Sequence, residues 1–124
     1  MWFRIDLRSP ETINEQIKRG IKESVLKGEV TDEELLPSIR EMASILRVNP
    51  NTVARAYREL ESEGIIIARQ GLGYLLAKNR EKIRESLLES LQEEFRKYLI
   101  RFKRLGISLE EIQEVVRLSW QKMK

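Results

Sequence analysis

Two helix starts that stand close together limit the fold of this chain more than any other feature of the sequence. Ser38 and Glu41 have the spacing of a capping box, in which both side chains bond backbone amides at one helix start. Eleven residues after Ser38, Asn49 is a good helix cap, and Pro50 supplies helical φ where no amide donor is needed. The first helix therefore ends near Leu46, and only a tight turn separates the two helices.

A further helix is predicted before this pair. It starts at Ser9–Pro10 or at Thr12, which has capping-box spacing to Glu15, and it ends at Gly28. Its apolar side chains recur every four residues: Ile13, Ile17, Ile21 and Val25. Residues 2–8 alternate almost regularly between apolar and charged side chains, and this alternation predicts a short strand.

The segment after the helix pair completes a recognisable order of elements. The later helix of the pair continues to about Glu63, and Gly64 supplies the left-handed residue that ends it. Its buried face consists of Val53, Ala56, Tyr57 and Leu60. Apolar runs at 65–68 and 74–77 flank a tip with two glycines and predict a β-hairpin. The first helix, an exposed connection over 29–36, the helix pair and the hairpin follow one another in the order of a winged helix-turn-helix. The predicted fold is therefore mainly α with a small β-hairpin.

The rest of the chain has a long helical pattern. One helix is predicted from Arg80 to about Leu105, and a last helix follows Gly106. Residues 79–124 are too few to enclose a ligand pocket and still form an independent core, so their apolar faces need a partner. We therefore expect a winged-helix domain over 1–78 and a helical dimerisation region over 79–124, which joins two copies in a symmetric homodimer. The predicted dimerisation residues are Leu87, Leu91, Phe95, Leu99, Phe102, Ile112, Val116 and Trp120.

The composition excludes several classes of protein. The chain has no cysteine and no histidine, which removes thiolate nucleophiles, the commonest zinc ligands and the commonest general base. The glycines of the hairpin tip are too close together for a phosphate-binding loop. An enzyme, a cofactor and a metal site are therefore not expected. No apolar run approaches the roughly 20 residues of a membrane helix, and the chain start lacks a secretory signal, so we expect a cytoplasmic protein without a membrane partner.

The placement of charge is more informative than its total. The formal net charge is +3, but residues 1–78 carry twelve basic and twelve acidic side chains. The helix that follows Asn49 has short polar and basic side chains in its first half and no carboxylate before Glu59. Its first turn also presents free backbone amides to base edges and phosphates. These features predict that this helix lies in the major groove of double-stranded DNA.

The predicted DNA-binding residues lie at three places. The start of the shorter helix contributes a basic side chain that can contact phosphate or a guanine edge, and the hairpin tip can reach the backbone or the minor groove. The residues are Ser38 and Arg40 at the first place, Asn49, Asn51, Thr52, Arg55 and Arg58 at the second, and Arg69, Gln70 and Gly71 at the tip. Taken singly, Arg55 or Arg58 is also compatible with a solvated helix face.

Four runs of residues resemble the GntR family of repressors, and the second of them is similar to the YtrA-like subfamily. The runs are LPSIRE (36–41), VNPNTVARAY (48–57), LESEGI (60–65) and RQGLG (69–73). The resemblance covers roughly residues 13–77 and implies a dimeric regulator that often represses transporter operons. It also associates Arg40, Asn51, Thr52, Arg55 and Gly71 with DNA contact. Family members usually have glycine where this chain has Arg47, so either Arg47 adopts the left-handed conformation or the turn differs.

Other interpretations stay open for parts of the chain. Winged helices also serve as protein-interaction modules, although a helix face without acidic residues argues against that use here. The basic cluster at 96–104 is a solvated helix face or a contact for DNA or a membrane surface. The aromatic residues Phe95, Phe102 and Trp120 are expected to anchor the core and the dimer interface, and the sequence does not indicate whether a small-molecule effector exists.

Overall fold

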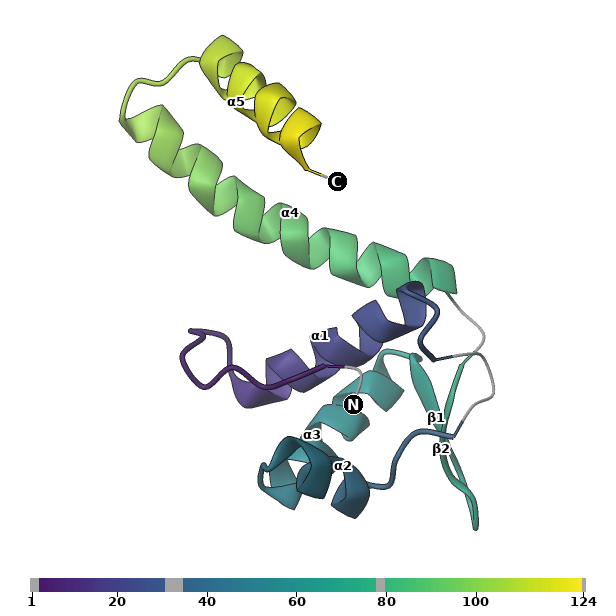
Figure 1. Cartoon of the computed structure of the whole chain (residues 1–124). Coiled ribbons are helices and arrows are strands. Elements are labelled where there is room, and N and C mark those ends of the chain that lie inside the picture. The colour runs from purple at the N-terminus through teal and green to yellow at the C-terminus, as the bar shows by residue number, and fades with distance from the viewer. Residues whose placement is uncertain (1–2, 31–34, 78–79, 124) are drawn as a thin grey trace. The chain divides into compact units, whose positions relative to one another are not determined.

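The computed structural model describes residues 3–30, 35–77 and 80–123, which are mainly helical with one β-hairpin (Figure 1). This confirms the predicted fold class. The elements are α1 (Ile13–Leu26), α2 (Ile39–Leu46), α3 (Pro50–Ser62), β1 (Ile66–Arg69), β2 (Gly73–Leu76), α4 (Arg80–Arg104) and α5 (Leu109–Lys122). The chain divides into two compact units, Met1–Leu87 and Leu88–Lys124, so the division falls inside α4.

The start of the chain packs along α1 without forming a strand. The predicted strand over 2–8 is wrong for the described part, residues 3–8. The Gln16 side chain satisfies this backbone instead, because its Oε1 accepts from the Asp6 amide at 2.7 Å and its Nε2 donates to the Asp6 carbonyl at 2.9 Å. The ring of Phe3 lies against Gly20, where a Cβ atom would collide with it. The alternation of apolar and charged residues therefore reflects packing on a helix.

The helix ends have the predicted caps. The Thr12 hydroxyl accepts a hydrogen bond from the Glu15 amide at 3.1 Å at the start of α1. At the start of α2, the Glu41 amide donates to the Ser38 hydroxyl at 3.1 Å, and the Ser38 amide donates to the Glu41 carboxylate at 3.0 Å. Arg47 ends α2 with φ 59° and ψ 50°, so a non-glycine residue does adopt the left-handed conformation in this turn.

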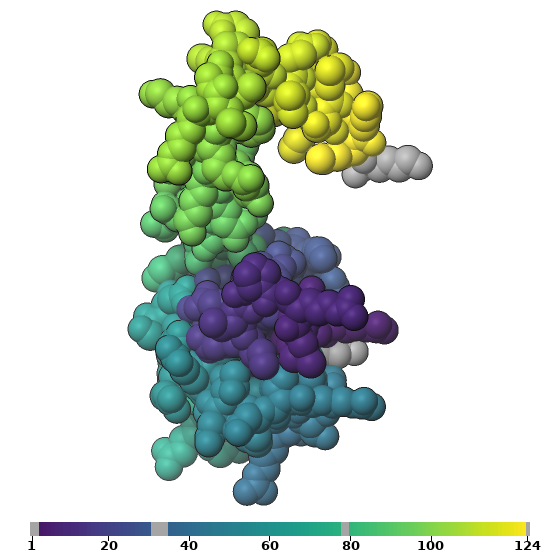
Figure 2. Space-filling model, turned by 90° about the vertical axis from the view of Figure 1, so that its left-hand side faces the viewer, coloured from purple at the N-terminus to yellow at the C-terminus, as the bar shows by residue number. Residues whose placement is uncertain are grey.

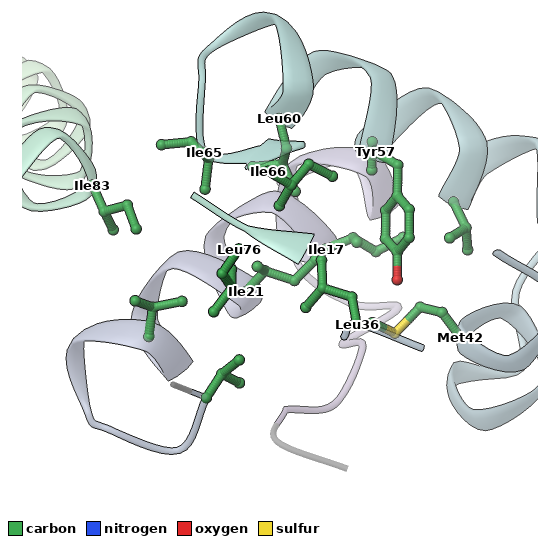
Figure 3. Packing of buried hydrophobic residues seen from close by; sticks show 14 of the residues in the cluster. Ile17, Ile21, Leu36, Met42, Tyr57, Leu60, Ile65, Ile66, Leu76 and Ile83 are labelled. Carbon is green, nitrogen blue, oxygen red and sulfur yellow. The ribbon is translucent and has the colours of Figure 1, made fainter. Parts of the chain in front are cut away.

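The core of the first unit lies between α1, α2, α3 and the hairpin (Figure 3). All four residues predicted for the buried face of α3 are completely buried. Tyr57 is the largest of them, and its hydroxyl donates to the Pro37 carbonyl at 2.7 Å. Its ring meets the ring of Tyr74 on β2 edge to face, with 5.0 Å between the centroids. Tyr57 thus joins α3 to the segment before α2 and to the hairpin.

The hairpin is antiparallel, with Ile66 opposite Leu76 and Arg69 opposite Gly73. Leu35 adds an isolated bridge to Leu75 on the outer side of β2. The expected exposure of the connection over 29–36 holds for Glu29 and Leu35 but is wrong for Val30 and Leu36, which are buried in the core. Residues 31–34 of this connection lie outside the described residues.

α4 and α5 carry most of the exposed apolar side chains. Ile83 is the only described residue of α4 that is buried, and it belongs to the core of the first unit. In the second unit, Ser108 and Glu111 form the predicted capping box at the start of α5, and none of the described residues of α5 is buried. Among the described residues, no helix is both long enough and apolar enough to cross a membrane.

Candidate nucleic-acid interface

The part of α3 that precedes Glu59 presents polar and basic side chains to solvent. The Asn49 side chain caps the helix by accepting a hydrogen bond from the Asn51 amide at 2.8 Å. Asn51, Arg55 and Arg58 are exposed, and Thr52 is half-buried. The first turn contains no acidic residue. This end of α3 therefore combines the positive end of the helix dipole with side chains that can bond base edges and phosphates.

The start of α2 is a second capped helix end with a basic residue in its first turn. Arg40 is exposed at this position. Its acidic neighbour Glu41 is engaged in the capping box, and hydrogen bonds from the backbone and the side chain of Ser38 lower the pKa of Glu41. The segment that carries α2 and the start of α3, coloured blue to teal, lies at the surface of the first unit in Figure 2.

The hairpin tip is the third predicted place of contact. Arg69, Gln70 and Gly71 are all exposed there. The Leu72 amide donates to the Arg69 carbonyl at 3.0 Å and closes the turn, which requires the positive φ of 79° at Gly71. A Cβ atom at Gly71 would meet nothing within 4 Å, so the reason for glycine is conformation and not space. Of the ten residues predicted for DNA contact, nine are exposed and Thr52 is half-buried.

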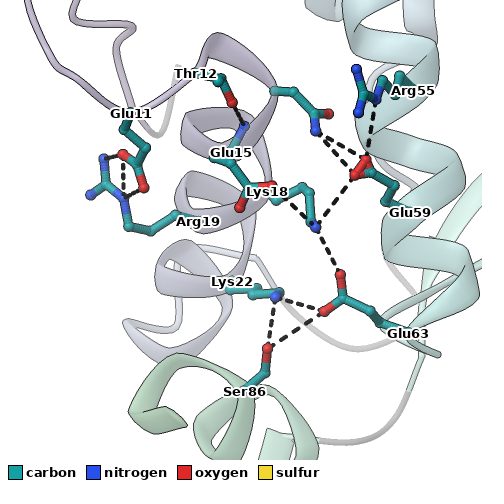
Figure 4. Close-up of polar contacts among 11 residues, drawn as sticks. Glu11, Thr12, Glu15, Lys18, Arg19, Lys22, Arg55, Glu59, Glu63 and Ser86 are labelled. Atoms are coloured by element: carbon teal, nitrogen blue, oxygen red, sulfur yellow. Dashed lines mark hydrogen bonds and ion pairs between the residues drawn. The ribbon is translucent and has the colours of Figure 1, made fainter. Parts of the chain in front are cut away.

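Two carboxylates at the far end of α3, those of Glu59 and Glu63, are held by α1 (Figure 4), whereas the Glu61 carboxylate accepts from the Ala68 amide of the hairpin at 3.2 Å. The Glu59 carboxylate accepts from the Asn14 amide at 3.0 and 3.1 Å and lies 3.6 Å from Lys18 Nζ. The Glu63 carboxylate lies 3.1 Å from Lys18 Nζ and 2.8 Å from Lys22 Nζ. The absence of a carboxylate before Glu59 was visible in the sequence, but the partners of these carboxylates on α1 were not predicted. The four-residue spacing of Lys18 and Lys22 on one side of a helix was the available signal.

The pKa values of both carboxyls lie below their usual range, for different reasons. For Glu59, the main cause is the hydrogen bond from Asn14, and nearby positive charge adds to it. For Glu63, burial alone would raise the pKa, but the hydrogen bonds and charges of Lys22 and Lys18 outweigh this effect. Both groups are therefore ionised at neutral pH, and two lysines of α1 balance their negative charge.

Arg55 lies one turn before Glu59 on α3 and forms an ion pair with it. Its Nε lies 3.5 Å from the Glu59 carboxylate, and its side chain is 69% exposed. A long ion pair at such an exposed position contributes little to stability, so breaking it costs little. The guanidinium can therefore exchange Glu59 for a phosphate or a base edge.

The predicted dimerisation residues differ in how much of their surface their own chain covers. Leu91, Phe95, Val116 and Trp120 are exposed, and Trp120 is 75% exposed. The other four are half-buried, namely Leu87, Leu99, Phe102 and Ile112. Leu87 lies in the first unit and packs against its core. So many exposed apolar side chains on two helices are unusual for a monomeric protein.

Comparisons with known proteins agree with this geometry. Residues 13–76 match the family model described as bacterial regulatory proteins, gntR family. The HTH-type transcriptional repressor YtrA of Bacillus subtilis is 38% identical over 93% of this chain and 89% of its own. A GntR family transcriptional regulator from Listeria monocytogenes is 31% identical, with a TM-score of 0.76 over 91% of this chain and 97% of its own. YtrA from Sulfolobus acidocaldarius is 33% identical, with a TM-score of 0.59 over 97% of this chain and 98% of its own.

Proposed function

Because this chain belongs to the GntR family of bacterial regulatory proteins, we propose that it is a repressor that binds a palindromic operator as a homodimer. Membership of this family supports a role in DNA binding and in the regulation of transcription. We infer three further properties that family membership alone does not establish: repression, a symmetric operator and a homodimer. The similarity to the YtrA-like subfamily supports a transporter operon as the target. Because a bacterial regulator must bind chromosomal DNA, we also propose that the protein is located in the cytoplasm.

The distribution of charge along α3 is the observation that carries the proposal. Before Glu59, α3 offers Asn51, Arg55 and Arg58 to solvent, whereas Glu59 and Glu63 are bound by α1. A helix in the major groove reads bases with its first turns, and a carboxylate there would repel phosphate. The ion pairs with α1 thus support binding at one end of α3, although residues 1–78 have no excess of positive charge.

The same proposal assigns α4 and α5 to the dimer interface. A twofold axis would bring the exposed apolar side chains of one copy onto the same side chains of the other. Two recognition helices related by this axis would then meet two half-sites in successive major grooves on one side of the duplex, about one helical turn apart. The symmetry of the operator would follow from the symmetry of the protein.

The DNA-binding part is tested with single substitutions on α3. Asn51→Ala and Arg55→Ala are compared with Ser62→Ala, an exposed change at the far end of the same helix. Operator fragments are first recovered from genomic DNA by selection with the full chain, and fluorescence anisotropy then gives the affinity. We expect each of the first two variants to lose about 1–3 kcal/mol of binding free energy. If both bind as tightly as Ser62→Ala while folded, the assignment of the recognition helix is wrong.

The dimer is tested in the full chain by sedimentation equilibrium at micromolar concentration. The double variant Leu91→Glu and Phe95→Glu places charges on the exposed apolar side of α4, and Glu89→Gln is the control at an exposed polar site. We expect the double variant to sediment as a monomer and the control as a dimer. A double variant that remains dimeric would contradict the interface, and a monomeric wild-type protein would contradict the dimer itself.

A further inference from the structure

Arg80 fastens the first turn of α4 to the end of α1. Its Nη1 donates to the Val25 carbonyl at 2.9 Å, and its Nη2 donates to the Leu26 carbonyl at 3.0 Å. These carbonyls belong to the last four of α1, which have no partner within their own helix. The positive guanidinium also lies at the negative end of the α1 dipole. One side chain thus caps α1 and fixes the start of α4.

Ser86 and Ile83 fasten the second turn of α4 (Figure 4). Lys22 of α1 donates to the Ser86 hydroxyl at 2.7 Å and to the Glu63 carboxylate at 2.8 Å, and the Ser86 hydroxyl lies 3.5 Å from the same carboxylate. Glu63 is the residue that ends α3. Ile83 is completely buried in the core of the first unit. Since Arg80, Ile83 and Ser86 are spaced by three residues, they share one side of α4.

These contacts link α4 directly to the recognition helix. Lys22 and Glu63 form one polar cluster with Ser86, so a rotation of α4 at its base would break bonds to both α1 and α3. Beyond this base, α4 continues as one helix to Arg104 in the second unit. This helix contains no proline or glycine that would kink or interrupt it.

We propose that this α4 junction, formed by Arg80, Ile83 and Ser86 with Lys22 and Glu63, determines which spacing between operator half-sites the protein accepts. The inference rests on the proposed homodimer. In each copy the junction ties the recognition helix to the helix that carries the dimer interface. Loosening the junction would let the recognition helix turn about the base of α4, and a wider range of half-site spacings would then fit. The junction residues lie outside the three predicted places of DNA contact, so we assign them a positioning role.

The experiment measures affinity as a function of half-site spacing. Synthetic operators carry two identical half-sites, taken from the selected genomic sequence, and the spacer between them varies by one base pair at a time. The variants are the full chain with Ser86→Ala, and with Arg80→Ala and Ser86→Ala together. Arg84→Ala is the control, because it is an exposed arginine in the same turns of α4. Sedimentation mass and affinity for a single half-site are measured in parallel.

The readout is the ratio between the affinity at the preferred spacer and the affinity at a spacer two base pairs longer. We expect the double variant to reduce this ratio by about fivefold to tenfold, since hydrogen bonds to charged groups hold the junction. Ser86→Ala retains the Lys22–Glu63 pair and is expected to reduce the ratio less, so it serves if the double variant does not fold. Single half-site affinity and mass should stay unchanged.

Three results would overturn the inference or the proposed function. If both variants dimerise and keep the wild-type ratio, the junction does not set the spacing and the inference is wrong, although the proposed function stands. If the wild-type protein itself shows no preferred spacer, the proposed binding of a palindromic operator as a homodimer fails first. A loss of ratio in Arg84→Ala equal to that in the double variant would also contradict the inference.

Discussion

Replacing Ile83 by alanine measures how firmly the first turns of α4 belong to the winged-helix unit. Ile83 is completely buried, whereas all other described residues of α4 are half-buried or exposed. It packs into the core that holds α1, α3 and the hairpin together. The substitution therefore removes the only completely buried side chain among the described residues of α4, next to the half-buried Leu87 on the same core.

The expected loss follows from the groups that are removed. Isoleucine to alanine deletes three carbon atoms, and burial of each contributes about 0.8 kcal/mol, which gives roughly 2.4 kcal/mol. A cavity adds to this value unless neighbouring side chains move into it. The free energy of unfolding should therefore fall by about 2–4 kcal/mol, a large part of the roughly 5–15 kcal/mol that stabilises a domain.

The assay is urea unfolding of the full chain, followed by far-ultraviolet circular dichroism at a fixed protomer concentration. The fixed concentration matters because association changes the apparent stability. Leu72→Ala is the control, since Leu72 is a 64% exposed residue at the hairpin tip, and it should change the free energy by less than about 0.5 kcal/mol. If Ile83→Ala loses no more than Leu72→Ala, the first turns of α4 do not share the core, and the reasoning is refuted.

Three further predictions concern single features of the first unit. The pKa values of Glu59 and Glu63 lie below 4.5, so their charge stabilises the fold above that pH, and the contribution is lost as the pH falls through the lowered values. Urea unfolding between pH 7 and pH 3 should show this loss, and Glu63→Gln should show a smaller one; an equal loss would contradict the assignment. Arg47→Gly should raise the free energy of unfolding by about 0.5–1.5 kcal/mol, because the left-handed φ strains a residue with a Cβ atom. A lower urea midpoint for this variant would show that the turn is not strained. Tyr57→Phe leaves the Pro37 carbonyl without its donor and should cost about 1–3 kcal/mol in thermal unfolding, whereas an unchanged midpoint would mean that the bond contributes nothing.

The local signals in the sequence were sufficient for the helix-turn-helix. Caps depend on residues within three positions of each other, so Ser38 with Glu41 and Asn49 with its proline fix two helix starts without any tertiary information. The glycines after α1 and α3 fix their ends in the same way. The ten candidate DNA-binding residues were chosen from this local pattern, and their role stays a prediction.

Contacts between distant residues could not be read in this way. The strand predicted over 2–8 failed because period-two alternation shows only that two faces differ, and here the backbone is satisfied by Gln16 of α1. The partners of Glu59 and Glu63 were missed because they lie more than forty residues earlier in the chain. Likewise, the apolar residues of α4 follow one continuous helical pattern in the sequence. In the structure, Ile83 packs in the core of the first unit, whereas Phe95 is exposed in the second.

The continuity of α4 across both units limits how the length of this protein can change. Each residue of an α-helix adds 1.5 Å and a turn of about 100°, so one inserted or deleted residue after Leu87 would turn the following side chains of α4 by that angle about the helix axis. A substitution in the same stretch leaves the phase untouched. Relatives of this chain should therefore vary in the exposed polar side chains of α4 but change its length in steps near seven residues, which are almost two full turns. Chimaeras that exchange C-terminal regions between relatives should therefore keep the number of residues in α4 unchanged.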